Sequence, residues 1–313
     1  MKFRLAAALL SCLTLFAAHA QPVQTVVPFP AGGPLDSLAR IVTSKLSSSA
    51  EPYVVDNRAG ANGMIGAKAV GGAQPDGRTW LFADGAMVSV NPKLYPKDAN
   101  FDVEKDLTPV AGLVLQPSIL VVNANSPWKT MKDFIAAAKL KPLNYASGGT
   151  GSTGHLTMEL FAGAAGITPT HIPYKGGAPA MNDLLGGQVD VAFVSVAGAM
   201  GHVKGGKLRA LAVSGPQRLA SLPDVPTVAE AGVPNFQVQG GYFIFLPAKT
   251  TPELMKTVSQ KALKVMTDPD VQQRVRALGM EPTPMDMAEA AKWIAADKAR
   301  MGKVIADKGI KAE

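Results

Sequence analysis

The strongest constraint on the fold of this chain is an alternation of short β-prone runs with stretches of helical periodicity. Runs rich in β-branched and aromatic residues predict strands at 25–29, 53–56, 79–83, 119–123, 143–146, 170–173, 189–194, 208–213 and 242–246. Helices are predicted at 36–46, 63–71, 130–138, 154–164, 178–185, 252–267, 269–278 and 287–308. Strands that alternate with helices indicate an α/β fold with mostly parallel sheets, which the helical C-terminal quarter is expected to cover as an outer layer.

Residues 1–20 carry the pattern of a secretory signal peptide. Two basic residues, Lys2 and Arg4, precede an almost unbroken apolar run at 5–17, and Ala18-His19-Ala20 has the small-x-small form of a cleavage site. An apolar run of this length is too short to span a bilayer. We therefore expect secretion, cleavage after Ala20 and a mature chain that begins at Gln21.

The single cysteine of the sequence, Cys12, lies inside this segment. Because Leu9-Leu10-Ser11-Cys12 loosely resembles a lipoprotein box, lipid anchoring at Cys12 is the alternative to cleavage after Ala20. A mature chain without cysteine forms no disulfides and has to be stabilised by its apolar core. With about 290 residues it is long enough for such a core, and long enough for two domains.

The formal net charge of the whole sequence is +7 at pH 7, and two of the positive charges belong to the signal segment. The other basic residues are spread along the chain without a block of Lys and Arg. A nucleic-acid-binding protein usually concentrates its positive charge and interleaves it with aromatic residues. The charge pattern therefore argues against nucleic acid as a partner and slightly favours anionic ligands.

Two places look like crossings between domains. The β-prone run 119–123 is followed by Ser126-Pro127-Trp128, and Gly240-Gly241 precedes the run 242–246. Two crossings mean that one domain is inserted into the other. We expect an outer lobe at 21–123 plus 241–313 and an inserted lobe at 124–240, with a ligand bound between them where strand ends face each other.

Three loops share one design, in which a strand leads through glycines into a helix. In the first, Phe29, Ala31, Gly32 and Gly33 precede a predicted helix that Asp36 is expected to cap. Free N–H groups and the dipole at a helix N-terminus form an anion site. For any single loop, an ordinary strand-to-helix turn remains the alternative interpretation.

The other two loops lie in the predicted inserted lobe. The loop at 146–155 spaces Gly149 and Gly154 like a phosphate-binding loop, but His155 and Leu156 stand where Lys and Ser/Thr are required, which excludes nucleotide binding. The loop at 171–180 repeats the strand, glycine and helix order. Together the three loops predict that an anion, best a carboxylate, is held from both lobes.

A series of stretches in fixed order resembles one known family, the Bug family of extracytoplasmic solute receptors, the binding components of tripartite tricarboxylate transporters. The resemblance covers the whole mature chain. It rests on "VPFPAGGPLDSLAR", "VVDNRAGANGMIGAKAV", "PDGRTWLFA", "NPKLYP", "LNYASGGTGSTGHL", "HIPYKGGAPAMNDLLGGQVDVAF", "GKLRALAVSGPQR" and "LPDVPTVAEAG". It implies a type II periplasmic-binding-protein fold, two α/β lobes joined by two crossover strands, in a periplasmic and monomeric receptor without catalysis.

The resemblance also implies a binding site. The first loop would hold one carboxylate of the ligand through backbone N–H groups and ordered water. The residues implied there are Phe29, Ala31, Gly32, Gly33 and Asp36. The opposing lobe would contribute Ser147, Thr150, Gly151, Ser152, His155, Tyr174 and Gly176, and the segment Asp84–Val88 would line the outer-lobe wall, with Ala86 and Met87. The implied partner is a membrane permease complex in transient contact. A sensor kinase that reads the closed state is the alternative.

Some features leave the ligand open. Where many relatives carry Ser-Trp-x-Gly, this chain has Gly240-Gly241-Tyr242, and Met87, Val88 and Tyr242 favour an aromatic or longer aliphatic acid. Asp190, at the end of a predicted strand, either caps a backbone group or meets a ligand ammonium group.

Catalysis and metal binding are not expected. Ser152 and His155 do not form a Gly-x-Ser-x-Gly elbow, so the sequence predicts no nucleophilic enzyme. His155 is better explained by a local hydrogen bond or by ligand contact than as a catalytic base. The histidines have no paired spacing, so we expect neither a zinc site nor any cofactor.

Overall fold

The computed structural model describes residues 21–94 and 101–311. The predicted signal peptide, its cleavage site and Cys12 lie outside the described residues. Within the described part, no helix has both the length and the apolar character needed to cross a bilayer.

The strands are β1 (Val23–Val27), β2 (Tyr53–Asn57), β3 (Thr79–Asp84), β4 (Leu107–Asn123), β5 (Asn144–Ser147), β6 (Thr170–Pro173), β7 (Val191–Ser195), β8 (Leu208–Val213), β9 (Gln239–Pro247) and β10 (Glu281–Met285). The helices are α1 (Pro34–Leu46), the 3-10 helix η1 (Ala61–Gly63), α2 (Met64–Gly71), α3 (Ala86–Ser89), α4 (Asn91–Leu94), α5 (Val103–Asp106), α6 (Met131–Leu140), α7 (Thr153–Ala165), α8 (Gly177–Leu185), α9 (Val196–Lys204), α10 (Pro252–Met266), α11 (Pro269–Ala277) and α12 (Met287–Asp307).

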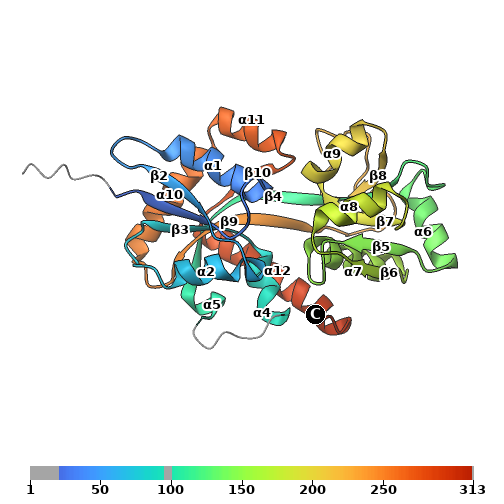
Figure 1. The fold of residues 1–313 in the computed structure, drawn as a ribbon, viewed down its shortest axis with the longest axis horizontal. Coiled ribbons are helices and arrows are strands. Elements are labelled where there is room, and N and C mark those ends of the chain that lie inside the picture. Colours follow the sequence, from blue (N-terminus) through green and yellow to red (C-terminus); the bar gives the residue numbers. More distant parts are fainter. Residues whose placement is uncertain (1–20, 95–100, 312–313) are drawn as a thin grey trace, which may run out of the picture.

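Figure 1 shows two lobes, each with its own sheet between helices. In lobe 1 the strand order is β2-β1-β3-β9-β4, and β10 pairs with β4. Trp80 and Phe82 of β3 pack on the face covered by α1, α10 and α11, whereas Leu81 and Ala83 pack on the face covered by α2 and the first half of α12. This alternation follows from the two-residue period of a strand, so both faces of the sheet are buried.

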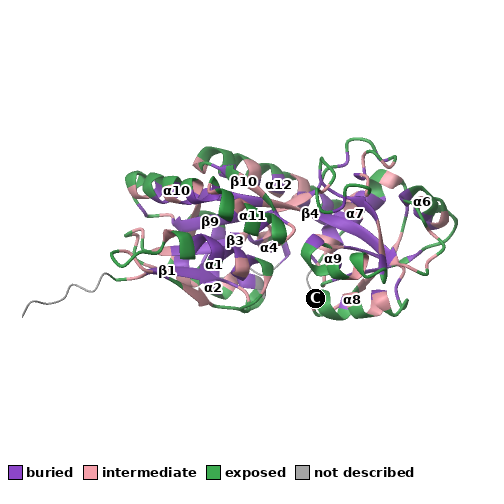
Figure 2. Cartoon of the chain, turned by 90° about the horizontal axis from the view of Figure 1, so that it is seen from above, coloured by how far each residue is buried: buried purple, intermediate pink, exposed green. Residues whose placement is uncertain are grey.

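Lobe 2 repeats this three-layer arrangement. Its strand order is β4-β7-β5-β6, and β8 pairs with β4. Tyr145 and Phe193 face α6 and α7, while Ala146 and Ala192 face α8 and α9. The buried strands in the middle of each lobe stand out in Figure 2. Both lobes are therefore α/β units, as the alternation of elements predicted.

The sheets are mixed rather than mostly parallel. β1 runs parallel to β2 and β3, and β5 runs parallel to β6 and β7. Among the described strands, every antiparallel pair involves β4 or β9. These two strands run between the lobes in Figure 1, so the departure from a parallel sheet comes from the crossover connections.

The register of β4 marks where the chain changes lobes. From Leu107 to Pro117 it pairs with β9, and from Ser118 to Asn123 it pairs with β7 and β8. The return strand begins at Gln239, opposite Pro117. Residues 119–123, predicted as the last strand of the outer lobe, thus pair within lobe 2. A continuous apolar strand carries no local signal at the point where it switches sheets.

The C-terminal helix α12 contacts both lobes. Ala290 and Ile294 pack in the core of lobe 1, and Met301, Val304 and Ile305 pack in the core of lobe 2. The helix starts with a capping box between Asp286 and Glu289, the sequence signal of a helix N-terminus. It was predicted as an outer layer, and the structure adds that this layer bridges the two lobes.

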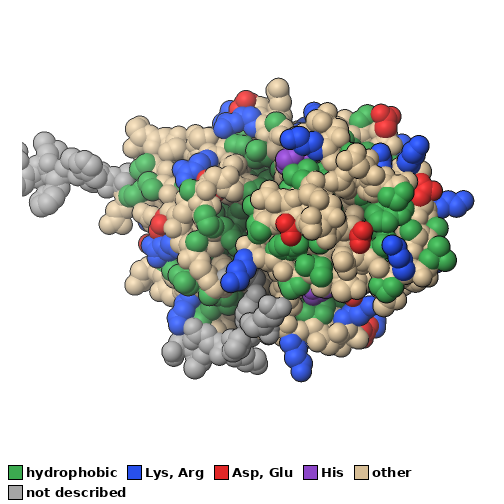
Figure 3. All heavy atoms as spheres, turned by 45° about the vertical axis from the view of Figure 1, so that its right-hand side comes forward, with side chains coloured by type: hydrophobic (Ala, Val, Ile, Leu, Met, Phe, Trp, Pro, Cys, Tyr) green, Lys and Arg blue, Asp and Glu red, His purple; other side chains and the backbone are tan. Residues whose placement is uncertain are grey.

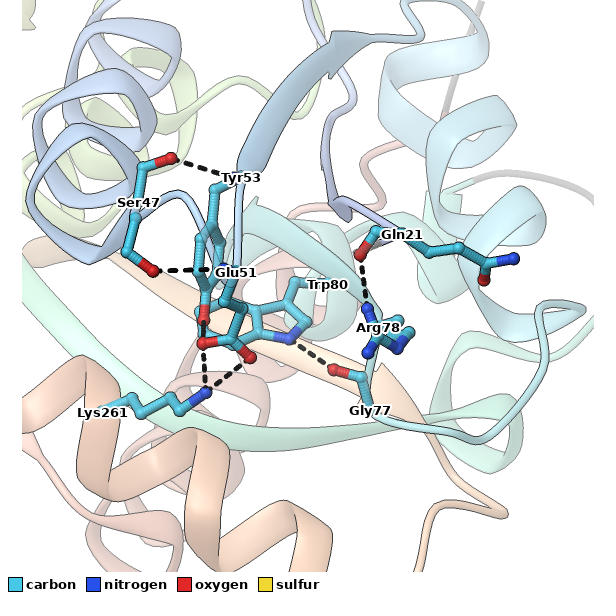
Figure 4. A network of polar contacts seen from close by, with 9 residues as sticks. Gln21, Ser47, Glu51, Tyr53, Gly77, Arg78, Trp80 and Lys261 are labelled. Atoms are coloured by element: carbon cyan, nitrogen blue, oxygen red, sulfur yellow. Dashed lines mark hydrogen bonds and ion pairs between the residues drawn. The ribbon is translucent and has the colours of Figure 1, made fainter. Parts of the chain in front are cut away.

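The start of the described chain is tied to lobe 1 by polar contacts that Figure 4 shows. Arg78 donates to the carbonyl oxygen of Gln21, and Glu51 accepts a bond of 2.7 Å from Lys261 of α10. Tyr53 meets Trp80 edge to face, with ring centroids 5.2 Å apart. The predicted core position of Trp80 is confirmed, because the side chain is only 1% exposed.

Some elements had no strong sequence signal. The β10 segment contains Pro282 and Pro284, which disfavour a strand assignment. The α9 segment contains two glycines, which lower helix propensity. Both form because tertiary pairing and packing outweigh local preference.

Candidate functional site

A cavity of about 640 Å³ opens where lobe 1 faces lobe 2. The N-terminal ends of four helices border it: Pro34 begins α1, Thr153 begins α7, Gly177 begins α8, and Ser195 caps α9. The cavity lies at the carboxyl ends of β5 and β7, the usual place for a ligand in an α/β sheet. Its wall consists of Pro34, Ala146, Ser147, Gly148, Ser152, Thr153, Gly154, Gly177, Ala178, Ala180, Met181, Asn182, Ala192, Phe193, Val194, Ser195, Gly198 and His202.

The carboxylate of Asp36 holds the first loop in its conformation through hydrogen bonds. Its Oδ2 accepts bonds of 2.9 Å from the N–H of Gly32 and from Nε of Arg40, and its Oδ1 accepts a 2.9 Å bond from Asn57. Burial by itself would raise the pKa of Asp36, but these hydrogen bonds outweigh it and lower the pKa. Helix α1 has Gly33 at its N-cap and no side-chain cap, so the prediction that Asp36 caps this helix was wrong.

The first loop contains N–H donors that no protein group in the described part of the chain uses. The N–H groups of Phe29, Ala31 and Gly33 have no partner among the described residues, whereas that of Gly32 is used by Asp36. Gly32 has φ +85°, a conformation that favours glycine. Phe29, Ala31 and Gly33 thus keep N–H groups that are unpaired within the described chain, in the loop that leads to Pro34, which lines the cavity, while Gly32 and Asp36 shape the loop.

The second loop is held by hydrogen bonds to its own lobe. The hydroxyl of Ser147 accepts from the N–H of Gly149 at 3.1 Å and lies 2.7 Å from Nε2 of His171. The N–H of Gly151 donates to Nδ1 of His155 at 3.0 Å. Ser152 caps α7 by accepting from the N–H of His155. The N–H donors of Gly148, Thr150, Thr153 and Gly154 have no partner in the described structure.

His155 lies beneath this loop and not on the cavity wall. The ring is 4% exposed and stacks on His171, with centroids 3.9 Å apart and planes 9° from parallel. Burial and the neighbouring His171 lower the pKa of His155 to about 4. The two readings of the sequence were a local hydrogen bond and ligand contact, and the local hydrogen bond is the one present.

The third loop lies beside the second. The hydroxyl of Tyr174 donates to Asp183 at 2.6 Å, a bond that raises the pKa of Tyr174 to about 12. The N–H of Gly176 donates to the carbonyl of Gly148, which joins the two loops. The N–H groups of Gly177 and Ala178, at the start of α8, face the cavity without a partner among the described residues.

Of the fifteen predicted site residues, only Ser147 and Ser152 line the cavity, and Asp190, Ala86 and Met87 have other places in the structure. Asp190 precedes β7, at the end of the strand opposite the cavity, and accepts a 2.7 Å bond from the N–H of Asn144. The N–H of Ala86 donates to Asp84 at 2.8 Å, and Met87 is buried in lobe 1 at 2% exposure. Asp190 therefore serves as a backbone acceptor, the first of its two predicted roles.

The wall formed by α9 was missed by sequence reasoning. Ser195, Gly198 and His202 contribute to it. Ser195 directly follows a predicted strand and is a favoured N-cap residue, so this signal was present in the sequence. Among the described residues, no group of three or more metal-ligating side chains comes together.

Two α/β lobes, two crossover strands and a cavity ringed by helix N-termini define the class of two-lobed solute-binding proteins. A family model described as "Tripartite tricarboxylate transporter family receptor" matches residues 38–310. The chain belongs to this family, a family of solute-binding receptors.

Solved structures agree with this assignment. The periplasmic binding protein BugD is 30% identical, with a TM-score of 0.78 and coverage of 93% of this chain and 99% of that one. Rpa4515 of Rhodopseudomonas palustris, solved with adipate, is 31% identical, with a TM-score of 0.82 and coverage of 94% and 99%. MatC (Rpa3494) of Rhodopseudomonas palustris, solved with malate, is 30% identical, with a TM-score of 0.76 and coverage of 91% and 99%. The predicted Bug-type fold is therefore confirmed.

Proposed function

We propose that this protein is a periplasmic receptor that captures a small carboxylate between its lobes and presents it to a membrane permease complex. The observation that carries the proposal is the ring of four helix N-termini around one cavity. Each N-terminus offers N–H donors and the positive end of a helix dipole, so the cavity attracts an anion.

The free donors suit a carboxylate. Gly148, Thr153, Gly154, Gly177 and Ala178 line the cavity and supply backbone N–H groups from lobe 2. From lobe 1, where Pro34 lines the cavity, the first loop would add the N–H groups of Phe29, Ala31 and Gly33, which have no partner among the described residues. Hydrogen bonds to a charged acceptor contribute about 1.5–3 kcal/mol each, so a few of them can offset much of the entropy lost on binding. That two family relatives are solved with adipate and malate supports the same ligand class.

The other residues that line the cavity indicate which kind of carboxylate is preferred. Met181, Ala192, Phe193 and Val194 line the cavity with apolar side chains, whereas no Asp or Glu lines it within the described chain. An ammonium group would therefore be desolvated without a counter-charge, which is unfavourable. The preferred ligand is a carboxylic acid with an aliphatic or aromatic body and no amino group.

A thermal-shift screen of Gln21–Glu313 tests the ligand class with adipate, malate and benzoate against glutamate and putrescine. A ligand at about 100 times its dissociation constant adds about 2.7 kcal/mol of stability, a shift that is easily measured. We expect adipate or benzoate to raise the melting temperature more than glutamate. A shift with glutamate or putrescine alone would contradict the proposed class.

A matched pair of variants tests the site. Ser195 caps α9, and both Asp and Asn are good N-cap residues, so Ser195→Asp and Ser195→Asn both keep the helix. Asp adds a negative charge at the cavity wall, and Asn adds none. We expect Ser195→Asp to raise the Kd of the bound acid about tenfold or more and Ser195→Asn to change it less than about threefold. Equal effects of the two variants on the Kd would show that the ligand carboxylate does not bind near Ser195.

A further inference from the structure

Two histidines and a tyrosine form a stack beneath the second loop. His155 comes from α7, Tyr145 from β5 and His171 from β6. The rings of His155 and His171 are 3.9 Å apart, and those of Tyr145 and His171 are 4.8 Å apart. The strand register places Tyr145 directly opposite His171. The stack is thus fixed by the sheet and is a rigid base for the loop above it.

Each histidine holds one part of the loop. His155 accepts the N–H of Gly151 at 3.0 Å, and His171 lies 2.7 Å from the hydroxyl of Ser147. The same hydroxyl also accepts a 3.1 Å hydrogen bond from the N–H of Gly149. Neither imidazole is on the cavity wall, whereas Ser147, Gly148 and Ser152 are. The histidines therefore contact the loop from behind.

We propose that His155 is a positioning residue for the ligand, which fixes the loop 148–151 by accepting the Gly151 N–H, with His171 bracing Ser147 beside it. The inference rests on the proposed function, because the loop matters only if its N–H groups bind the ligand. It assigns to His155 a role in binding without contact to the ligand.

The loop needs such support because of its composition. Gly149 has φ +120° and Gly151 has φ +79°, so both occupy conformations that few other residues adopt. Glycines gain much conformational freedom when a hydrogen bond is lost. A side chain at Gly151 would also meet Leu94 of α4, which shows that the loop touches lobe 1 at this point. A loop held between His155 and Leu94 can keep its N–H groups directed at the cavity.

The groups around His155 keep its Nδ1 able to accept a hydrogen bond. Its lowered pKa leaves the ring neutral near pH 7. Because the N–H of Gly151 donates to Nδ1, the one ring proton is on Nε2 and Nδ1 keeps its lone pair. Glu159, on the next turn of α7, accepts a 2.7 Å bond from the hydroxyl of Tyr145 and pairs with Lys308 at 3.3 Å. The Glu159 charge is thereby engaged by two partners, while it opposes the effect of His171 on the His155 pKa.

Two substitutions separate positioning from packing. In His155→Asn, Oδ1 stands where Nδ1 stood, so the acceptor for Gly151 is kept and the ring is lost. In His155→Leu, the apolar packing is largely kept and the acceptor is lost. If His155 merely fills space, Leu should bind ligand better than Asn, because a buried amide is less favourable than a buried apolar group.

With adipate as the probe, we expect His155→Leu to raise the Kd about tenfold and His155→Asn to raise it less than about threefold. The reverse order would overturn the proposal. If His155→Leu fails to fold, His155→Phe, which keeps a stacked ring without an acceptor, takes its place in the same comparison.

A ligand-free measurement makes the outcome independent of the proposed function. Amide hydrogen exchange of Gly151, followed by NMR, should be at least about tenfold faster in His155→Leu than in the wild type and in His155→Asn. Equal exchange in all three proteins would overturn the positioning role. A wild type that binds no carboxylate would instead contradict the proposed function and leave the exchange result to decide on His155.

Discussion

The backbone N–H of Ser118 donates a 2.8 Å hydrogen bond to the hydroxyl of Ser214, at the point where β4 passes from lobe 1 to lobe 2. That hydroxyl in turn donates a 2.6 Å bond to the carbonyl of Val238, the residue before the return strand β9. Ser214 is fully buried. One side chain thus connects the two crossover segments.

We expect Ser214→Ala to lower the free energy of unfolding by about 2 kcal/mol. The substitution leaves two buried backbone groups, the N–H of Ser118 and the carbonyl of Val238, without their partner, and each such group costs about 1–3 kcal/mol less any local relaxation. Urea unfolding measures the change. Ser221→Ala, at an exposed position, is the control and should change stability by less than about 0.5 kcal/mol. Equal stability of the two variants would show that water replaces the Ser214 hydroxyl.

Asp36→Ala should lower the free energy of unfolding by about 2–3 kcal/mol and weaken carboxylate binding. The carboxylate of Asp36 accepts hydrogen bonds from Gly32, Arg40 and Asn57. Its loss removes these bonds, which hold the first loop in its conformation. Because the pKa of Asp36 in the folded chain lies below its usual 3.8, this stabilisation is present above pH 3.8 and is lost as the pH falls through the folded value. Urea unfolding at pH 7 and calorimetric titration check both effects. A loss of stability with unchanged affinity would show that the first loop does not take part in ligand binding.

The stability of the wild type should fall as the pH is lowered from about 6.5 to about 4 in part because of His155. The pKa of His155 is about 4 in the folded chain against 6.5 for a free imidazole, so in this range the unfolded chain binds one proton more. The contribution is present above pH 6.5, is lost toward pH 4, and amounts to at most about 3 kcal/mol. Denaturant unfolding across this range should show a shallower pH slope in His155→Asn. An unchanged slope would assign the dependence to other groups.

Asp84→Asn should stabilise the protein at pH 7. Burial raises the pKa of Asp84 from 3.8 to about 6, so the folded chain holds an unfavourable negative charge at neutral pH. The sign is opposite to that of His155, because stability from Asp84 is present below pH 3.8 and is lost as the pH rises to about 6. Because the side chain is only partly buried, we expect a gain of about 1–2 kcal/mol at pH 7 and no gain at pH 3.5. Asp224→Asn, at an exposed position, is the control, and an equal gain there would point to net charge instead.

Local sequence patterns were sufficient to predict most of the helices and strands and the loops around the candidate site. The run 79–83 is a short apolar run with aromatic residues, which predicted a buried strand, and the structure buries Trp80 and Phe82 on one face of β3 and Leu81 and Ala83 on the other. The glycine loops after β1, β5 and β6 could be found because a strand end, a glycine and a helix start follow one another in the sequence. Ser195 was overlooked although it carries the same kind of signal.

The roles of individual site residues could not be predicted in this way. Asp36 looked like a helix cap, but its partner Asn57 lies on β2, and only the pairing of β2 with β1 brings the two together. Asp190 could have met a ligand, but the direction of β7 places it at the far end of the strand. Surface charge gave no further guide, since acidic and basic side chains are scattered over the face of the molecule that Figure 3 shows.

The sequence alone determined the two-lobed α/β architecture and the three glycine loops, because hydrophobic periodicity and turn chemistry act over neighbouring residues. Only the tertiary structure decided which of the loop donors are free for a ligand. The N–H groups of Gly32 and Gly151 are used within the protein, by Asp36 and His155, while those of Gly33 and Gly154 are not. The physical reason is that a backbone N–H pairs with an acceptor only when folding orients that acceptor toward it. Asp36 and His155 lie only four residues along the chain from the groups they accept, but contacts with Asn57 of β2 and His171 of β6 hold their side chains in place.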